Sequence, residues 1–344
     1  MTAVGSTRHR LKRALVALLI SLTIVAVAAF AAFKCSPWSS VLIIRWEFSR
    51  AGIDGNAALS KRVPPGIRTQ AAIQYDANDP NALLDIYRPA ALDGHALPIV
   101  FWIHGGGYIA GSRADVANYA RILAADGYAV IAVDYPLAPE NHYPVPVIAL
   151  NRALMFLSDN AASLQLNRNQ IILAGDSAGA QLAAQIALLI SSPTYARATG
   201  MHAGIQRTQL AGALLFCGPY EGRSIVAEAS SSWYSRAFVW SYFGSLNPPA
   251  SILRAFSVAS HVTQEFPPSF INVGNADVMA PQSVALADAL QRQGVRVETL
   301  FYPASHTPPL DHEYQFDLTL PESNETLKRT QAFLRSLVVN SNNQ

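Results

Sequence analysis

Short apolar runs alternate with helical patterns of apolar residues over most of the chain. The runs have the length and composition of buried strands and cover 71–75, 83–87, 99–103, 128–133, 171–174, 210–216, 270–273 and 295–301. Apolar positions with helical spacing cover 114–125, 149–157, the residues after 177, 283–293 and 325–337. Strands that alternate with helices predict βαβ units with right-handed crossovers. We therefore predict an α/β fold in which helices flank a mostly parallel central sheet.

The beginning of the chain carries a separate pattern. Four lysines and arginines stand between positions 8 and 13, and an uncharged, apolar run follows over 14–33. About 20 apolar residues are enough to span a bilayer as a helix, and flanking basic residues stay in the cytoplasm. We predict a cytoplasmic basic segment over 1–13 and a transmembrane signal anchor over 14–33, with the rest of the chain outside the cytoplasm. The alternative is a cleaved signal peptide and a secreted protein.

Two further segments interrupt the alternation of strands and helices. Residues 34–69 are predicted to form a linker or cap segment. Its apolar side could lie on the membrane surface or cover a site, and the periodicity of the segment does not favour either arrangement. Seven aromatic residues fall between positions 220 and 243. We expect this insertion, about 218–268, to form a helical cap in which one or two rings line an apolar pocket. The remaining chain, 70–340, is predicted to be one α/β domain.

The composition and charge of the chain exclude several classes of protein. Hydrophobic residues make up 51% of the 344 residues, which is enough for a sizeable core. The formal charge is +2, and no basic cluster beyond the N-terminus indicates a nucleic-acid partner. Cys35 and Cys217 do not stand at metal-ligand spacing, so we expect no metal site. Cys217 lies in an apolar run and fits a buried, small apolar side chain.

The first candidate for chemistry is the stretch Gly175-Asp176-Ser177-Ala178-Gly179, which stands between a predicted strand and a predicted helix. In that setting a G-x-S-x-G sequence forms a nucleophile elbow, which projects the serine hydroxyl from the sheet. Glycines at both ends let the strand and helix approach closely. The helix N-terminus offers free N–H groups to a developing negative charge. The same pattern also occurs in glycine-rich turns without chemistry, so its partners decide its meaning.

A second glycine turn lies upstream of the first. His104-Gly105-Gly106-Gly107 directly follows the strand predicted over 99–103. An HGGG turn upstream of the elbow is the expected second half of an oxyanion hole. Both turns follow strands of one parallel sheet, and sites in such sheets lie at the carboxyl ends of the strands. The two turns are therefore expected to meet.

A serine nucleophile also needs a base and a third group that orients the base. In this fold the expected chain order is Ser, then Asp or Glu, then His. Asp277 lies in the loop after the strand predicted over 270–273, although an aspartate there could also be a turn former. His306 and His312 both lie in the loop after the last predicted strand. The order of residues leaves both histidines open as the base.

Three motifs together resemble the hormone-sensitive-lipase-like esterases, a family of the α/β-hydrolase fold. They are His104 to Gly107, Asp134 to Glu140 and Gly175 to Gly179, and the resemblance covers about Leu83 to the closing helix. The chain departs from the family at Pro136, where an arginine is usual. In the family an aromatic residue often stands two positions after the triad histidine, and a glutamine follows it. The sequence His312-Glu313-Tyr314-Gln315 fits this pattern better than the sequence after His306.

The resemblance implies an α/β-hydrolase catalytic domain over 70–340 and an enzyme that hydrolyses carboxylic esters through an acyl-enzyme intermediate. It implies a triad of Ser177, Asp277 and His312. It also implies an oxyanion hole formed by Gly106, Gly107 and Ala178. The residues implied to support these motifs are His104, Gly105 and Asp176.

The implied substrate is a small or medium, mainly apolar ester. The resemblance implies that the enzyme uses no metal and no organic cofactor. The partners expected are this ester and, through the N-terminal helix, a membrane, while the oligomeric state stays open. The alternatives are an amidase or deacetylase with the same triad, a lipase, or a non-catalytic binding protein with the hydrolase fold.

Overall fold

An eight-stranded sheet forms the centre of this computed structural model, which describes residues 3–341. The strands lie in the order β1-β2-β4-β3-β5-β6-β7-β8. Their bounds are β1 (Ile67–Gln74), β2 (Leu83–Pro89), β3 (Leu97–Ile103), β4 (Ala129–Val133), β5 (Leu166–Asp176), β6 (Leu210–Phe216), β7 (Ser269–Val273) and β8 (Val297–Phe301). β2 pairs antiparallel with both β1 and β4, whereas every other neighbouring pair is parallel. The predicted mostly parallel sheet is confirmed.

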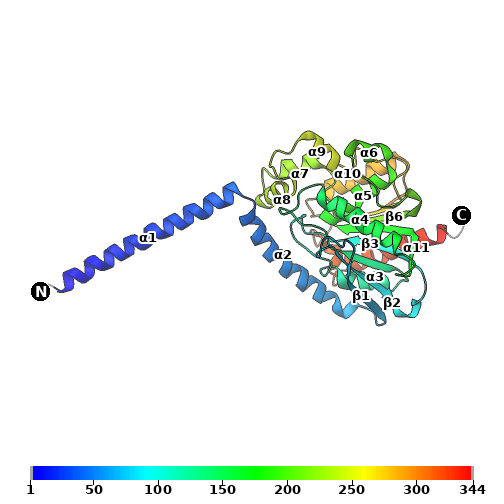
Figure 1. The fold of residues 1–344 in the computed structure, drawn as a ribbon, viewed down its shortest axis with the longest axis horizontal. Coiled ribbons are helices and arrows are strands. Elements are labelled where there is room, and N and C mark those ends of the chain that lie inside the picture. Colours follow the sequence, from blue (N-terminus) through cyan, green and yellow to red (C-terminus); the bar gives the residue numbers. More distant parts are fainter. Residues whose placement is uncertain (1–2, 342–344) are drawn as a thin grey trace.

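Helices cover both faces of this sheet (Figure 1). Their bounds are α1 (Ala3–Cys35), α2 (Trp38–Leu59), α3 (Ala117–Ala124), α4 (Val145–Asp159), α5 (Ala178–Ser191), α6 (Pro193–Thr199), α7 (Gly222–Glu228), α8 (Trp233–Phe243), α9 (Ala250–Phe256), α10 (Ala280–Arg292) and α11 (Pro321–Ser341). Side chains of α4, α5 and α10 join one apolar cluster, and side chains of α3 and α11 join a second. The sheet is therefore the middle layer of three.

The bounds of several elements differ from the predicted ones. β5 is longer than the predicted 171–174, because Leu166 and Asn167 also pair with β3. α4 begins before the predicted residue 149, since Pro146 stands in its first turn, where proline costs no helical hydrogen bond. β1 begins at Ile67, just before the domain boundary predicted at residue 70.

The aromatic insertion folds into helices, as predicted. α7, α8 and α9 all lie within 218–268. α8 contacts both α7 and α2, so the N-terminal segment and the insertion form one helical layer although they are far apart in the sequence. Figure 1 shows this layer at the end of the domain where α1 joins it.

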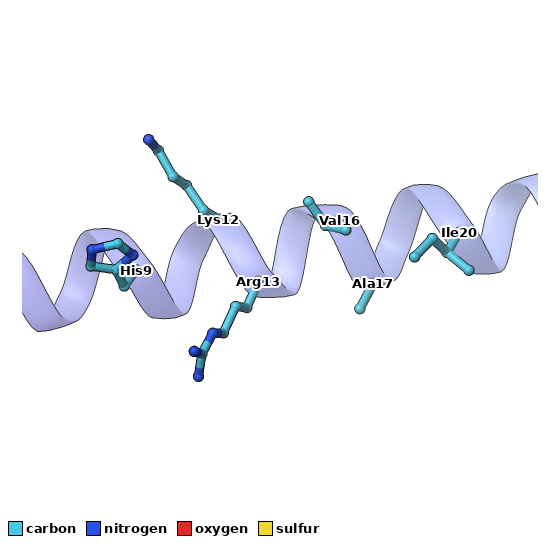
Figure 2. Close-up of a pocket in the computed structure, with 6 residues that line it drawn as sticks. All are labelled: His9, Lys12, Arg13, Val16, Ala17 and Ile20. Atoms are coloured by element: carbon cyan, nitrogen blue, oxygen red, sulfur yellow. The ribbon is translucent and has the colours of Figure 1, made fainter.

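α1 stands apart from the sheet and projects away from the domain (Figure 1). Its stretch Leu11–Cys35 is long and apolar enough to cross a membrane, and the most apolar window of it is wholly unburied. Figure 2 shows the cationic side chains of Lys12 and Arg13 just before the apolar surface that begins with Val16. Residues 1 and 2 of the predicted basic segment lie outside the described part of the chain. The transmembrane anchor and its orientation stay predictions.

Candidate active site

Ser177 occupies a sharp turn between β5 and α5. Its backbone has φ 51° and ψ −122°, which lies outside the regions that L-residues ordinarily adopt. The turn is tight enough to require glycine on either side. A Cβ on Gly175 would lie 2.5 Å from the carbonyl carbon of Gly179, and a Cβ on Gly179 would lie 2.0 Å from the carbonyl oxygen of Ile103. The sequence thus forms the strained strand-to-helix turn expected of a nucleophile elbow.

Ser177, His312 and Asp277 form a continuous hydrogen-bond chain. His312 Nε2 lies 2.8 Å from Ser177 Oγ, and His312 Nδ1 lies 2.8 Å from Asp277 Oδ2. The hydroxyl can donate to Nε2 while the Nδ1–H donates to the carboxylate. The Asp277 side chain is fully buried, and its other oxygen accepts the backbone N–H of Met279 at 2.7 Å. The carboxylate is therefore held in one orientation and holds the imidazole in turn.

The surroundings of His312 favour its protonated form. Burial by itself lowers the pKa of the imidazole, but the hydrogen bond to Asp277 and the nearby Glu313 carboxylate oppose burial, so the pKa of His312 lies well above 6.5. Burial also raises the pKa of the Cys217 thiol, which keeps it protonated at neutral pH. The imidazole beside Ser177 is consequently a stronger base than an ordinary histidine.

The other candidate histidine lies elsewhere. His306 Nε2 lies 3.0 Å from Glu322 Oε1, and its ring centre lies 4.6 Å from that of Tyr302. The structure therefore brings His312, and not His306, to Ser177. The aromatic residue that follows His312, Tyr314, is buried and accepts a hydrogen bond from Asn272 Nδ2 at 2.7 Å. This contact ties the end of the histidine loop to β7.

The HGGG turn lies directly beside the elbow. Gly106 and Gly107 have φ values of 106° and 61°, which favour glycine. A Cβ on Gly107 would lie 2.4 Å from Cε1 of Phe238, so the α8 ring rests on this glycine. Ala178 opens α5, so its N–H has no acceptor within the helix. The glycine turn and the start of α5 thus lie side by side next to Ser177.

Two buried side chains brace the glycine turn. The ring of His104 stacks on that of Tyr135 at 4.4 Å, and its Nδ1 lies 2.7 Å from the carbonyl oxygen of Gly105. Burial lowers the pKa of His104, which keeps the ring neutral. Asp176 accepts the backbone N–H of Gly105 at 2.8 Å and the indole N–H of Trp102 at 2.7 Å.

Sequence reasoning missed Glu313 as a member of the site. Its Oε1 lies 3.8 Å from His312 Nε2, and its backbone has φ 61°. Its carboxyl group also shares a hydrogen bond with Asp176, and burial together with Glu313 raises the pKa of Asp176 well above 3.8. The one feature of the sequence that could have indicated Glu313 was its position directly after His312. The carboxyl groups of Glu313 and Asp176 therefore lie close together next to the triad.

Cys217 is the second residue that sequence reasoning did not assign to the site. It lies just after β6, and its potential ligand atom stands within 4.8 Å of those of Asp277 and His312. These three are donors of the kind that could hold a metal ion. However, both ring nitrogens of His312 already have partners, since Nδ1 faces Asp277 Oδ2 and Nε2 faces Ser177 Oγ. No sequence spacing could reveal this contact, because the fold alone brings β6, β7 and the histidine loop together.

The chain is similar to known proteins along most of its length. Residues 100–307 match the family described as alpha/beta hydrolase fold, which is more than half of the chain. The carboxylesterase NlhH of Mycobacterium tuberculosis is 27% identical over 290 residues, which is 80% of this chain and 85% of that protein.

Two further matches differ in extent. Esterase LipC of the same organism is 32% identical over 120 residues, but this match spans only 34% of this chain and 30% of LipC. The crystal structure of inhibited esterase B from Lactobacillus rhamnosis superposes with a TM-score of 0.76 at 24% identity, covering 88% of this chain and 98% of that one. The last likeness shows the fold.

Proposed function

The chain belongs to the hormone-sensitive-lipase-like esterases of the α/β-hydrolase fold, and from this premise we propose that it is a serine carboxylesterase acting on small or medium, mainly apolar esters. The observation that carries the proposal is the hydrogen-bond chain from Ser177 through His312 to Asp277. The proposed setting is a single-pass membrane anchor that leaves the catalytic domain outside the cytoplasm.

In the proposed acylation step, His312 Nε2 takes the proton of Ser177 Oγ as the oxygen attacks the ester carbonyl. The protonated imidazole then gives this proton to the departing alcohol oxygen, which breaks the carbon–oxygen bond and leaves an acyl-serine. Asp277 keeps the Nδ1–H pointed away from the serine and stabilises the positive charge on the ring. In deacylation a water molecule repeats the sequence, with His312 again as base and then as acid.

The backbone N–H groups of Gly106, Gly107 and Ala178 are proposed to bind the oxyanion of both tetrahedral intermediates. Their orientation depends on the positive φ values of the two glycines and on the start of α5. One donor of this kind contributes about 3–4 kcal/mol to transition-state stabilisation. Asp176 and His104 act here as positioning residues, since both contact Gly105 and neither contacts Ser177 in the hydrogen bonds described.

The aromatic side chains of α8 and α2 that lie over the glycine turn, which we call the roof of the site, support the proposed preference for apolar esters. Phe238 of α8 rests on Gly107, and its ring centre lies 6.4 Å from that of Phe48 of α2. Tyr108, just after the glycine turn, stacks on Tyr242 at 3.8 Å. Aromatic rings therefore pack beside the glycine turn, and apolar lining with few polar groups is typical of small-ligand sites.

The proposal is tested with p-nitrophenyl esters of increasing acyl length and with the matching anilides. We expect hydrolysis of short and medium esters, a much slower reaction with anilides, and loss of about a million-fold in kcat for a folded Ser177→Ala variant. Equal rates on anilides would indicate an amidase, and a rate that rises only with long chains presented in droplets would indicate a lipase. Binding of esters without turnover by the wild-type chain would indicate a non-catalytic protein.

A further inference from the structure

α2 carries apolar side chains on two sides, and only one side has a partner within the described chain. Val41, Ile44 and Leu59 are buried against the domain. On the other side, five large apolar side chains are between 42% and 65% exposed, and we call this set the α2 outer face: Trp38, Leu42, Ile43, Trp46 and Ile53. Four of the five recur at positions 38, 42, 46 and 53, which places them along one stripe of the helix.

This face is too apolar to be an ordinary solvated helix surface. Scattered single apolar residues are normal on a protein surface, but a continuous stripe marks an interaction site. The stripe includes two tryptophans, the residue type that is enriched at the level of lipid headgroups. Arg50 stacks over the Trp46 ring with 5.1 Å between its guanidinium carbon and the ring centre. A cation beside an interfacial tryptophan is suited to lipid phosphate groups.

The α2 outer face continues directly from the apolar surface of α1. Only two residues separate the end of α1 at Cys35 from the start of α2 at Trp38. Phe33, near the end of α1, has its ring centre 6.3 Å from that of Trp233, which begins α8 and is itself exposed. Figure 1 shows α2 turning sharply away from α1 and running along the border of the domain. A bilayer crossed by α1 would therefore meet α2 side-on.

The inner side of the same helix reaches the active site through two contacts. Glu47 accepts a hydrogen bond from the Tyr234 hydroxyl of α8. Phe48 lies 6.4 Å, between ring centres, from Phe238, the ring that rests on Gly107. The α2 helix thus separates its outer face from the α8 ring that rests on Gly107.

From these observations we propose that the α2 outer face, together with Trp233, lies in the headgroup region of the membrane that α1 spans. This contact would hold the helical roof of the active site against the bilayer, so that apolar esters dissolved in the membrane reach Ser177 without crossing bulk water. The proposal rests on the proposed membrane anchor and on the proposed esterase activity. It adds a second, surface-lying membrane contact and a source for the substrate.

The first test measures the depth of three positions in the full-length chain, reconstituted in vesicles of phosphatidylcholine and phosphatidylglycerol. Cys35 is replaced by serine, and an environment-sensitive dye is attached to a single new cysteine in Trp46→Cys, Val25→Cys or Lys328→Cys. Val25 reports insertion of α1. Lys328 is exposed on α11 and is the matched water control. Nitroxide-bearing lipids then report contact with the bilayer by quenching the dye.

We expect quenching and a blue-shifted emission at positions 25 and 46, and neither at 328. Quenching at 25 with a water-like signal at 46 would overturn the surface contact while leaving the anchor in place. Absence of quenching at 25 would overturn the anchor and, with it, this inference. A blue shift at 46 that appears in detergent and grows with protein concentration would show that a second copy covers the face, and would also overturn the inference.

The second test separates membrane delivery from chemistry. Trp46→Glu places a charge on the outer face, away from the proposed triad. We expect the rate on a medium-chain ester dissolved in the vesicles to fall by about tenfold or more, since a charge in the interface opposes burial. The kcat/KM for water-soluble p-nitrophenyl acetate should stay within about twofold, as expected of a surface substitution remote from the chemistry. An equal loss of rate on both esters would contradict delivery from the membrane. If the wild-type chain hydrolysed neither ester, the esterase proposal would be contradicted, while the depth measurement would still stand.

Discussion

Asp176 accepts a hydrogen bond from the backbone N–H of Gly105 at 2.8 Å, across 71 positions of sequence. The residue before the proposed nucleophile is thereby joined to the turn that is proposed to hold the oxyanion. Trp102 donates to the other carboxyl oxygen at 2.7 Å, so both oxygens are used. Elbow and glycine turn are consequently held in register by one buried side chain.

Asp176→Asn is expected to disturb both stability and rate. The amide has only one acceptor oxygen, so either the Gly105 N–H or the Trp102 indole N–H would lose its partner. An unsatisfied buried donor costs about 1–3 kcal/mol, which urea unfolding would measure. The kcat on a short ester should fall more than KM rises, because the glycine turn is needed most in the transition state. An unchanged urea midpoint would contradict this account of Asp176.

The pH dependence of kcat/KM is expected to follow His312. The base must be neutral to take a proton, and its pKa is raised well above 6.5, so activity should fall as the pH drops through that raised value. Asp277→Asn removes the hydrogen-bonded carboxylate, which should move the acid limb to lower pH. It should also lower kcat by about four orders of magnitude. An acid limb at or below 6.5 in the wild-type enzyme would contradict the assigned environment of His312.

Glu313→Gln is expected to have a smaller effect of the same sign. Its carboxylate oxygen, 3.8 Å from His312 Nε2, raises the pKa of that histidine. Removal of the charge should shift the acid limb of kcat/KM to lower pH by up to about one unit, while kcat on the alkaline plateau stays nearly constant. A shift to higher pH would contradict an electrostatic role, and His306→Ala serves as the control that leaves the limb in place.

Gly107→Ala is expected to lower activity for two separable reasons. The left-handed backbone costs a residue with a Cβ about 1–2 kcal/mol, and the new methyl group would collide with Phe238. Phe238→Ala removes the second cost only. We therefore expect the double variant to recover part of the kcat lost in Gly107→Ala. Strictly additive losses in the double-mutant cycle would show that the ring does not touch the turn.

Much of the fold follows from local sequence patterns. Each predicted strand has a counterpart in the sheet, and the buried parallel strands are continuous apolar runs such as Ile99 to Ile103. The tight turn at Ser177 was predictable since only glycines fit at its ends. The candidacy of Asp277 followed from the chain order expected in this fold and from its place after a late strand, and the preference for His312 followed from the residues after it. Their roles in catalysis remain predictions.

What the sequence could not show depends on contacts between distant segments. Nothing near Phe238 indicates that its ring rests on Gly107, more than a hundred positions upstream, since this requires the cap to fold over the sheet. The position of Cys217 beside His312 likewise depends on three separate loops. For residues 34–69 the two faces of α2 explain the ambiguity, because the helix is apolar on both sides and periodicity does not separate them.

The most direct test of the central claim is the rate at which a fluorophosphonate labels the protein, with the modified peptide identified by mass spectrometry. We predict a single adduct on Ser177 in the wild-type chain, a rate at least about a thousand-fold lower in His312→Ala, and an unchanged rate in the matched variant His306→Ala. Labelling at another residue, or loss of labelling in His306→Ala rather than in His312→Ala, would contradict the assignment of Ser177 and His312 as nucleophile and base.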